Sequence, residues 1–378
     1  MIATASSMLL MFAVFMAVLI LMIGGIYWMV PRLTRPELFF AVTIDPAFRQ
    51  DPIARVIERR YQRQVLLHTL ISLLLLLFSW LAPAGSVLQG LLFFPAIFWQ
   101  TIGAFIAFQL ARRQVTPHAI TPPLIREASL EPRKPLFVGG CLAQIGPFLL
   151  LVLPCIYLAI RWNDLPLRFP IHWGLDGKPD GFATRSFLGV FGVPIIGAAL
   201  LGMLVFVALS TQWGLKHTRV SGFAGQQESR FLRLTLVMIL AVEYALALTL
   251  GVVSLLPLLA RENGPGFPIW VLLIFDPILL IMIGLFANRY GQGGWRLPAP
   301  QPAAHHPPIL GDGIPDRFWR WGVFYVNPDD PAIWVQKRFG IGYTLNMANP
   351  RSWLILGIFL LFVLGLLALS LTVGTLAR

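Results

Sequence analysis

Long apolar stretches alternate with short polar segments along the whole chain. Each stretch is about 20 residues long, enough to cross a hydrocarbon core of roughly 30 Å as a helix. Apolar residues do not alternate with period two, which argues against the strands of a membrane barrel. The pattern predicts an all-α polytopic membrane protein with about eight transmembrane helices, at 8–29, 65–81, 88–110, 139–160, 187–210, 232–259, 269–289 and 353–376.

The polar segments divide the chain into six parts. They are an N-terminal three-helix membrane region (1–138), a helix–hairpin–helix unit (139–210), further membrane helices (211–290), a proline-rich linker (291–313), a small β-rich cytoplasmic domain (314–352) and a last transmembrane helix (353–378). The helix containing the second span is predicted to begin in the cytoplasm. Asp51 can cap it, and Pro52 suits its first position.

Composition and charge support the membrane assignment. Hydrophobic residues make up 57% of the 378 residues and charged residues only 12%, about half the charged fraction of a soluble domain. The net charge of +12 is explained by topology rather than by nucleic acid, because cytoplasmic loops gather Lys and Arg. With the N-terminus outside, 23 of the 29 Lys and Arg fall in cytoplasmic connections. We therefore expect a multi-pass membrane protein with both termini outside and no nucleic-acid partner.

The connection before the last span combines β-prone runs with aromatic and basic residues. GVFYV, IWVQKR and IGYTLN are separated by turn-forming residues, which predicts three short strands. Such an element needs packing on the membrane domain or the bilayer. Its side chains suit the membrane interface, and they are Trp319, Trp321, Trp334, Arg317, Arg320, Lys337 and Arg338. A structural cap over the helix ends is the alternative interpretation.

Between two spans the chain reads RFPIHWGLDGKPDGFATRS, from Arg168 to Ser186. Asp-Gly pairs at 176–177 and 180–181 supply positive φ angles and close turns, so we expect a compact hairpin on the outer end of the bundle. Trp173 and Phe169 would anchor it at the membrane interface. His172 could contact an acidic or lipidic partner. The alternative is that His172 bonds within the hairpin and the motif only sets helix geometry.

This hairpin segment resembles the short extracellular motif of bacterial membrane proteins in domain-of-unknown-function family 1648, which includes the SdpI-type immunity proteins. The candidate site in this motif consists of Pro170, His172, Trp173, Asp176, Gly177, Pro179 and Asp180. The resemblance implies self-protection against a secreted, membrane-active toxin. It also implies a location in the bacterial inner membrane and signalling, by holding a transcriptional repressor at this membrane.

The segment DDPAIWVQKRFGIGYTLNMANP resembles a second bacterial family of unknown function, family 5808, often found in the same proteins. The residues that carry the match are Lys337, Arg338, Gly340, Gly342, Thr344, Leu345 and Asn346. The three additional N-terminal spans and this C-terminal domain distinguish the chain from SdpI-type proteins.

Two acids lie well inside predicted spans. Glu243 and Asp276 are on consecutive antiparallel spans at similar depth, and they could face one another and share a proton or bind a cation. Asp276 precedes Pro277, so it could instead satisfy backbone groups freed at a helix kink. His68 and Gln100 are polar points on helix faces, which more often join helices.

The sequence offers little support for an enzyme. There is no phosphate-binding glycine loop, no HExxH, no GxSxG and no paired-cysteine metal spacing. Cys141 and Cys155 lie about 21 Å apart along one helix and cannot bridge each other. We therefore expect no catalysis, no cofactor and no metal. Three functions stay open: recognition of a membrane-active toxin or envelope stress, proton- or ion-coupled transport through the two acids, and a structural membrane component.

Overall fold

The computed structural model describes residues 2–83, 86–121, 138–173, 179–215, 222–259, 270–298 and 312–375. Within these ranges, seven helices are long and apolar enough to cross a membrane. The protein is therefore a multi-pass, mostly helical integral membrane protein, as the apolar pattern predicts. The remaining predicted span, 269–289, forms the long helix α8 (Trp270–Tyr290), which is not among those seven.

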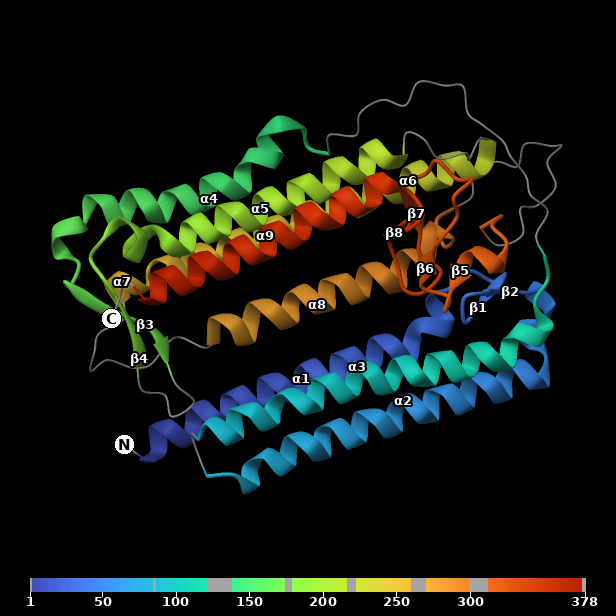
Figure 1. The fold of residues 1–378 in the computed structure, drawn as a ribbon, viewed down its shortest axis with the longest axis horizontal. Helices are drawn as coiled ribbons and strands as arrows, with labels where there is room; N and C mark the ends of the chain where they lie inside the picture. The colour runs from blue at the N-terminus through green and yellow to red at the C-terminus, as the bar shows by residue number, and fades with distance from the viewer. Residues whose placement is uncertain are drawn as a thin grey trace.

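The long helices run back and forth along one axis (Figure 1). They are α1 (Ile2–Leu33), α2 (Pro52–Phe78), α3 (Val87–Val115), α4 (Gly140–Ile160), α5 (Phe187–Leu215), α6 (Gly222–Ser254), α8 and α9 (Pro350–Thr375), and a short α7 (Leu256–Leu259) follows α6. The N- and C-terminal ends lie at one end of the molecule with strands β3 (Arg168–Trp173) and β4 (Pro179–Thr184) (Figure 1). We name this the hairpin end.

The helices form two groups. Helices α1, α2 and α3 pack together as the N-terminal bundle, and α4, α5 and α6 pack as a second bundle to which α9 adds along α5. Helix α8 lies between the bundles and contacts α1 on one side and α6 on the other (Figure 1). The two bundles therefore meet through α8 within the membrane-spanning part.

Helix α2 begins where the sequence predicts. Asp51 is its N-cap residue, and its carboxylate accepts a hydrogen bond of 2.7 Å from the Ile53 amide. Pro52 occupies the first helical position, where a missing amide proton is no loss. The caps fix the direction in which α2 leaves the loop that follows α1.

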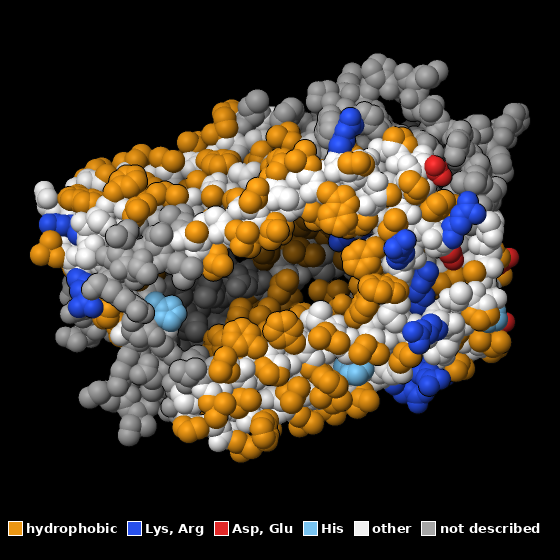
Figure 2. Space-filling model, in the orientation of Figure 1, with side chains coloured by type: hydrophobic (Ala, Val, Ile, Leu, Met, Phe, Trp, Pro, Cys, Tyr) orange, Lys and Arg blue, Asp and Glu red, His pale blue; other side chains and the backbone are white. Residues whose placement is uncertain are grey.

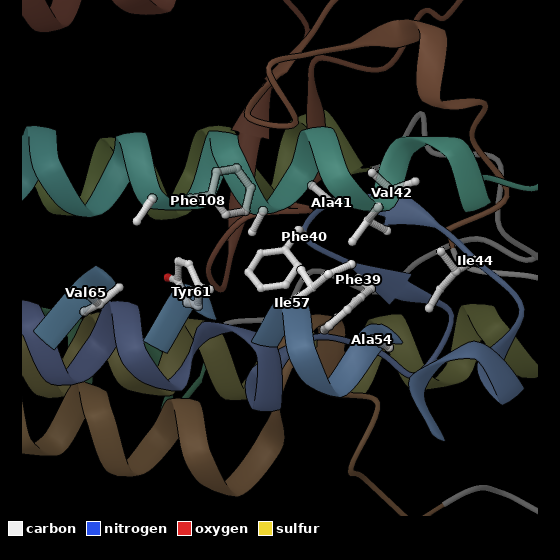
Figure 3. Close-up of a cluster of buried hydrophobic side chains, with 13 residues drawn as sticks. Phe39, Phe40, Ala41, Val42, Ile44, Ala54, Ile57, Tyr61, Val65 and Phe108 are labelled. Atoms are coloured by element: carbon white, nitrogen blue, oxygen red, sulfur yellow. The ribbon is translucent and has the colours of Figure 1, made fainter. Parts of the chain in front are cut away.

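The loop between α1 and α2 contains a hairpin that the apolar pattern did not predict. Strand β1 (Leu38–Phe39) pairs antiparallel with β2 (Val42–Thr43), and the turn residues Phe40 and Ala41 both have positive φ. This conformation costs roughly 1–2 kcal/mol per residue outside glycine. Burial of the Phe40 ring against Tyr61 and Phe108 contributes about 1.5–3 kcal/mol in return (Figure 3).

At the opposite end from the termini, residues 312–349 form a compact unit that we name the C-terminal module (Figure 1). Its strands are β5 (Trp319–Arg320), β6 (Phe324–Tyr325), β7 (Trp334–Gln336) and β8 (Tyr343–Leu345). The expected three strands are thus four, paired as two hairpins that are joined by a bridge between Tyr325 and Asn346. The difference arises because Trp319–Arg320, outside the predicted runs, turns back through Trp321 and Gly322, which both have positive φ.

Candidate functional site

The β3–β4 hairpin connects α4 to α5 and presents the first candidate site. Its strands pair antiparallel from Arg168 opposite Thr184 to Trp173 opposite Pro179, with register irregularities on both sides of His172. The expected hairpin is therefore present. Asp176 and Gly177 lie outside the described residues, and of Asp180 only the backbone, in β4, is described.

One face of this hairpin is buried in the second bundle. Phe169 and Ala183 pack with Leu158, Leu165 and Val190 in one apolar cluster. The prediction that Phe169 anchors the hairpin at the membrane interface is wrong, because its ring is fully buried in the protein. The physical reason is that the Phe169 ring packs on apolar side chains of the helices that the hairpin joins, whereas its neighbour Arg168 is exposed.

Polar contacts hold the base of the hairpin to α4 and α5. Arg185 donates through Nη1 to the carbonyls of Trp162, Asn163 and Leu165 at 3.2–3.4 Å. Ser186 accepts a hydrogen bond of 3.1 Å from the Gly189 amide and so caps the start of α5. The base is thus fixed to both helices that it joins.

The tip side of the hairpin has an exposed polar edge. His172 is exposed, Trp173 is half-buried, and Pro170 is buried. His172 lies opposite Gly181, and a Cβ added to this glycine would come within 2.8 Å of the His172 Cβ. Glycine at 181 therefore lets the two strands close at this point and places the imidazole outward.

The C-terminal module carries the second set of predicted residues, and its centre is Arg338. The Arg338 side chain is buried and donates to Asp312 through Nε and Nη2, each at 2.6 Å. It also pairs with Asp316 and lies 5.3 Å from the centre of the Trp319 ring. Burial lowers the pKa of the guanidinium, but the two carboxylates outweigh this and raise the pKa above its ordinary value.

The module is connected to the loop after α1 through the same network. Asp316 accepts hydrogen bonds from the Thr43 hydroxyl at 2.7 Å and from the Thr43 amide. Arg112, near the end of α3, donates to the Phe40 and Ala41 carbonyls, and Gln109 donates to the Trp321 carbonyl at 2.9 Å. Residues far apart in sequence therefore hold the module against the N-terminal bundle.

Two of the side chains expected at the membrane interface have other positions. Trp319 is 2% exposed and Arg338 is 1% exposed, so both belong to the interior of the module. Arg338 lies inside because Asp312 and Asp316 compensate its charge. Trp321 is exposed and Trp334 is half-buried.

The other matched residues of the module shape its turns. Asn346 is fully buried; it donates to the carbonyls of Asn327 and Asp330 and accepts from the amides of Asn327 and Ala348. Thr344 pairs with Val335 across β7 and β8. Gly340 and Gly342 have φ angles of 78° and 100°, which only glycine adopts readily.

Sequence reasoning missed the loop that follows α1. Arg49 donates to the carbonyls of Pro31, Arg35, Pro36 and Leu38 and to the Thr34 hydroxyl, and burial lowers its pKa to about 10. The loop thereby wraps around one guanidinium. A signal was available in the run LFFAVTI, which is β-prone and too apolar for an ordinary solvent-exposed connection.

The intramembrane acids are only partly described. Glu243 lies in α6, is 1% exposed, and its Oε2 has no hydrogen-bond partner among the described residues. Asp276 lies in α8, which packs against α6, but its side chain is outside the described part. Gln100 donates to Thr69 at 3.2 Å and so joins α3 to α2, as predicted for interhelical contacts.

Family comparisons assign both motifs. Residues 149–198 match the domain of unknown function DUF1648. This segment comprises the second half of α4, the β3–β4 hairpin and the start of α5. Residues 328–353 match a family of unknown function, DUF5808, which covers β7, β8 and the start of α9. No curated protein and no solved structure matches the chain.

Proposed function

We propose that the protein is a non-enzymatic receptor of the bacterial inner membrane. The β3–β4 hairpin lies outside and binds a membrane-active toxin or peptide, or senses the envelope stress that such an agent causes. The C-terminal module lies in the cytoplasm and reports the event to a cytoplasmic regulator. Its partners are thus the bilayer, the secreted agent and this regulator, without nucleic acid.

One observation carries this proposal. The exposed edge of the hairpin lies at one end of α5 and α9, and the C-terminal module lies at the other end of the same helices (Figure 1). Strand β4 contacts both α5 and α9. Helix α5 also contacts β7, and α9 begins directly after the module, where Asn349 accepts a hydrogen bond of 3.1 Å from the Arg351 amide. A displacement of the hairpin can therefore reach the module through two packed helices.

The DUF1648 match supports the choice of agent, because this family includes SdpI-type immunity proteins. The distribution of basic residues supports the orientation. Lys and Arg side chains gather at the module end (Figure 2), the expected cytoplasmic side.

A survival assay tests the proposal. A sensitive bacterium expressing the protein is challenged with SdpI-type toxins and a panel of membrane-active peptides. We expect protection by the parent chain and its loss in His172→Ala and Trp173→Ala at equal protein abundance. Phe187→Ala, an exposed aromatic residue at the start of α5, is the matched control. Protection that survives both hairpin substitutions would contradict the assigned role.

A second candidate function is proton- or cation-coupled transport through Glu243. Two observations favour it: the Glu243 carboxylate is buried in a membrane helix, and its Oε2 has no hydrogen-bond partner among the described residues. This function predicts that Glu243→Gln abolishes uptake or efflux in vesicles while insertion stays normal. Asp276→Asn is also expected to abolish transport with normal insertion, because this function assigns both acids to one proton or cation site.

A further inference from the structure

The loop between β7 and β8 bridges the two helix bundles. It comprises residues 337–342, KRFGIG, and we name it the KRFGIG loop. The Phe339 ring lies 4.3 Å from that of Phe108 and 5.5 Å from that of Tyr27, both in the N-terminal bundle. Ile341 packs with the cluster around Phe231 in the second bundle. The loop thus closes the module end of the space between the bundles.

Beside this loop, the described residues leave a hollow between the bundles (Figure 2). Figure 2 shows a hollow bordered by apolar side chains, in the region where α8 runs between the bundles in Figure 1. Ile278, Ile281 and Leu285 form an exposed apolar stripe along α8. A Cβ built at Gly340 would meet no atom within 4 Å, so the loop itself borders open space.

The hollow lies at the level of the membrane-spanning helices, where the surrounding medium supplies hydrocarbon chains. Water in such an apolar recess would lack hydrogen-bond partners. An empty recess would forfeit the contacts of its lining atoms. An acyl chain satisfies both conditions.

Lys337 lies at the module end of α8, because its carbonyl accepts a hydrogen bond from Gln292, which follows this helix. Its side chain is exposed, and desolvation by neighbouring protein atoms lowers the pKa of its ammonium. No described carboxylate pairs with it, in contrast to Arg338, which two aspartates neutralise. Arg35 lies close by, since it donates to Gln336, the preceding residue.

We propose that the hollow binds an anionic phospholipid from the leaflet at the module end, with its acyl chains along α8 and its phosphate on the ammonium of Lys337. Charge complementarity selects this occupant: the apolar hollow accepts the chains, and the cation at its end selects an anionic head group over a zwitterionic one. The inference does not depend on the proposed function, because the hairpin lies at the opposite end of the molecule.

Lipid retention tests this site. The full chain is reconstituted in nanodiscs of equal parts phosphatidylglycerol and phosphatidylcholine, extracted in mild detergent, and the retained lipids are counted by native mass spectrometry. We expect preferential retention of phosphatidylglycerol by the parent chain. In Lys337→Gln this preference should fall at least about fivefold, the effect of one basic residue on an anionic head group.

Two controls keep the result specific. Lys337→Arg should retain the preference, and Arg320→Gln, which removes an exposed charge from the other hairpin of the module, should leave it unchanged. An equal preference in Lys337→Gln and the parent would overturn the proposal, as would an equal loss in Arg320→Gln. A hydrophobic peptide is added in a further experiment. If it displaces the retained lipid and binds the parent and Lys337→Gln equally well, the hollow is a peptide site instead.

Discussion

The β3–β4 hairpin and the C-terminal module are both small β elements at ends of the helices, but they are held in different ways. The hairpin is held by an apolar cluster around Phe169, with Arg185 bonded to backbone carbonyls at its base. The module is held by a buried charge network around Arg338 that reaches Thr43. The first arrangement leaves one polar edge exposed, whereas the second turns its polar groups inward.

This difference suits the two elements to different tasks: the hairpin can present a residue to a partner, and the module can be held in one position. The hairpin presents the exposed His172 while apolar residues around Phe169 hold its other face on the bundle. A buried ion-pair network fixes one geometry, because a displaced Arg338 would leave two carboxylates without their partner. The module is therefore suited to move as one body rather than to open.

The largest effect is expected from Arg338→Ala. The substitution leaves Asp312 and Asp316 without their cation in a largely buried site, which costs about 3–5 kcal/mol. Thermal unfolding of the purified protein in detergent measures the loss. Arg320→Ala removes an exposed charge from the same module and should change stability by less than about 0.5 kcal/mol. Equal stability of the two variants would show that the network does not hold the module.

Phe169→Ala should have the next largest effect. Removal of a fully buried aromatic side chain costs about 3 kcal/mol and leaves a cavity under the hairpin. We expect faster proteolytic cleavage within 168–184 while the module stays protected. Phe187→Ala, on an exposed ring, should leave the cleavage rate at the parent level. Simultaneous exposure of the module would mean that the two ends are not independently held.

The smallest effect on stability is expected from Gly181→Ala. The added methyl group must displace His172, whose Cβ would lie 2.8 Å away, at a cost of about 1–2 kcal/mol. Because the exposed edge shifts while the apolar cluster stays, protection in the survival assay should fall more than protein abundance. Gly202→Ala, where a Cβ would meet no atom within 4 Å, should change neither quantity. Unchanged protection in Gly181→Ala would show that the geometry of this edge is not used.

The same comparison explains what the sequence could predict. The hairpin is built from contacts between residues 158 and 190, so its apolar strands and the Asp-Gly pairs of its segment made it recognisable. The helix start at Asp51 is equally local. The hollow between the bundles (Figure 2), by contrast, depends on how the bundles pack, for which no short sequence pattern exists.

The module could not be predicted in the same way. Arg338 contacts the Ala41 carbonyl across 297 positions, and Asp316 contacts Thr43 across 273. The local sequence around a basic residue does not reveal whether it is buried beside acids from elsewhere in the chain or exposed to lipid head groups. Apolar and charge patterns alone therefore assigned Arg338 and Trp319 to the membrane interface.

The opposite placement of the two ends across the membrane is the central claim, and cysteine accessibility tests it most directly. Cys141 and Cys155 are replaced by alanine, and single cysteines are introduced as Lys178→Cys in the hairpin segment and Arg320→Cys in the module. Intact cells are treated with a membrane-impermeant thiol reagent, and labelling is compared with that after lysis. We predict labelling of Lys178→Cys in intact cells and of Arg320→Cys only after lysis. Labelling of Arg320→Cys in intact cells, or protection of Lys178→Cys until lysis, would contradict this account.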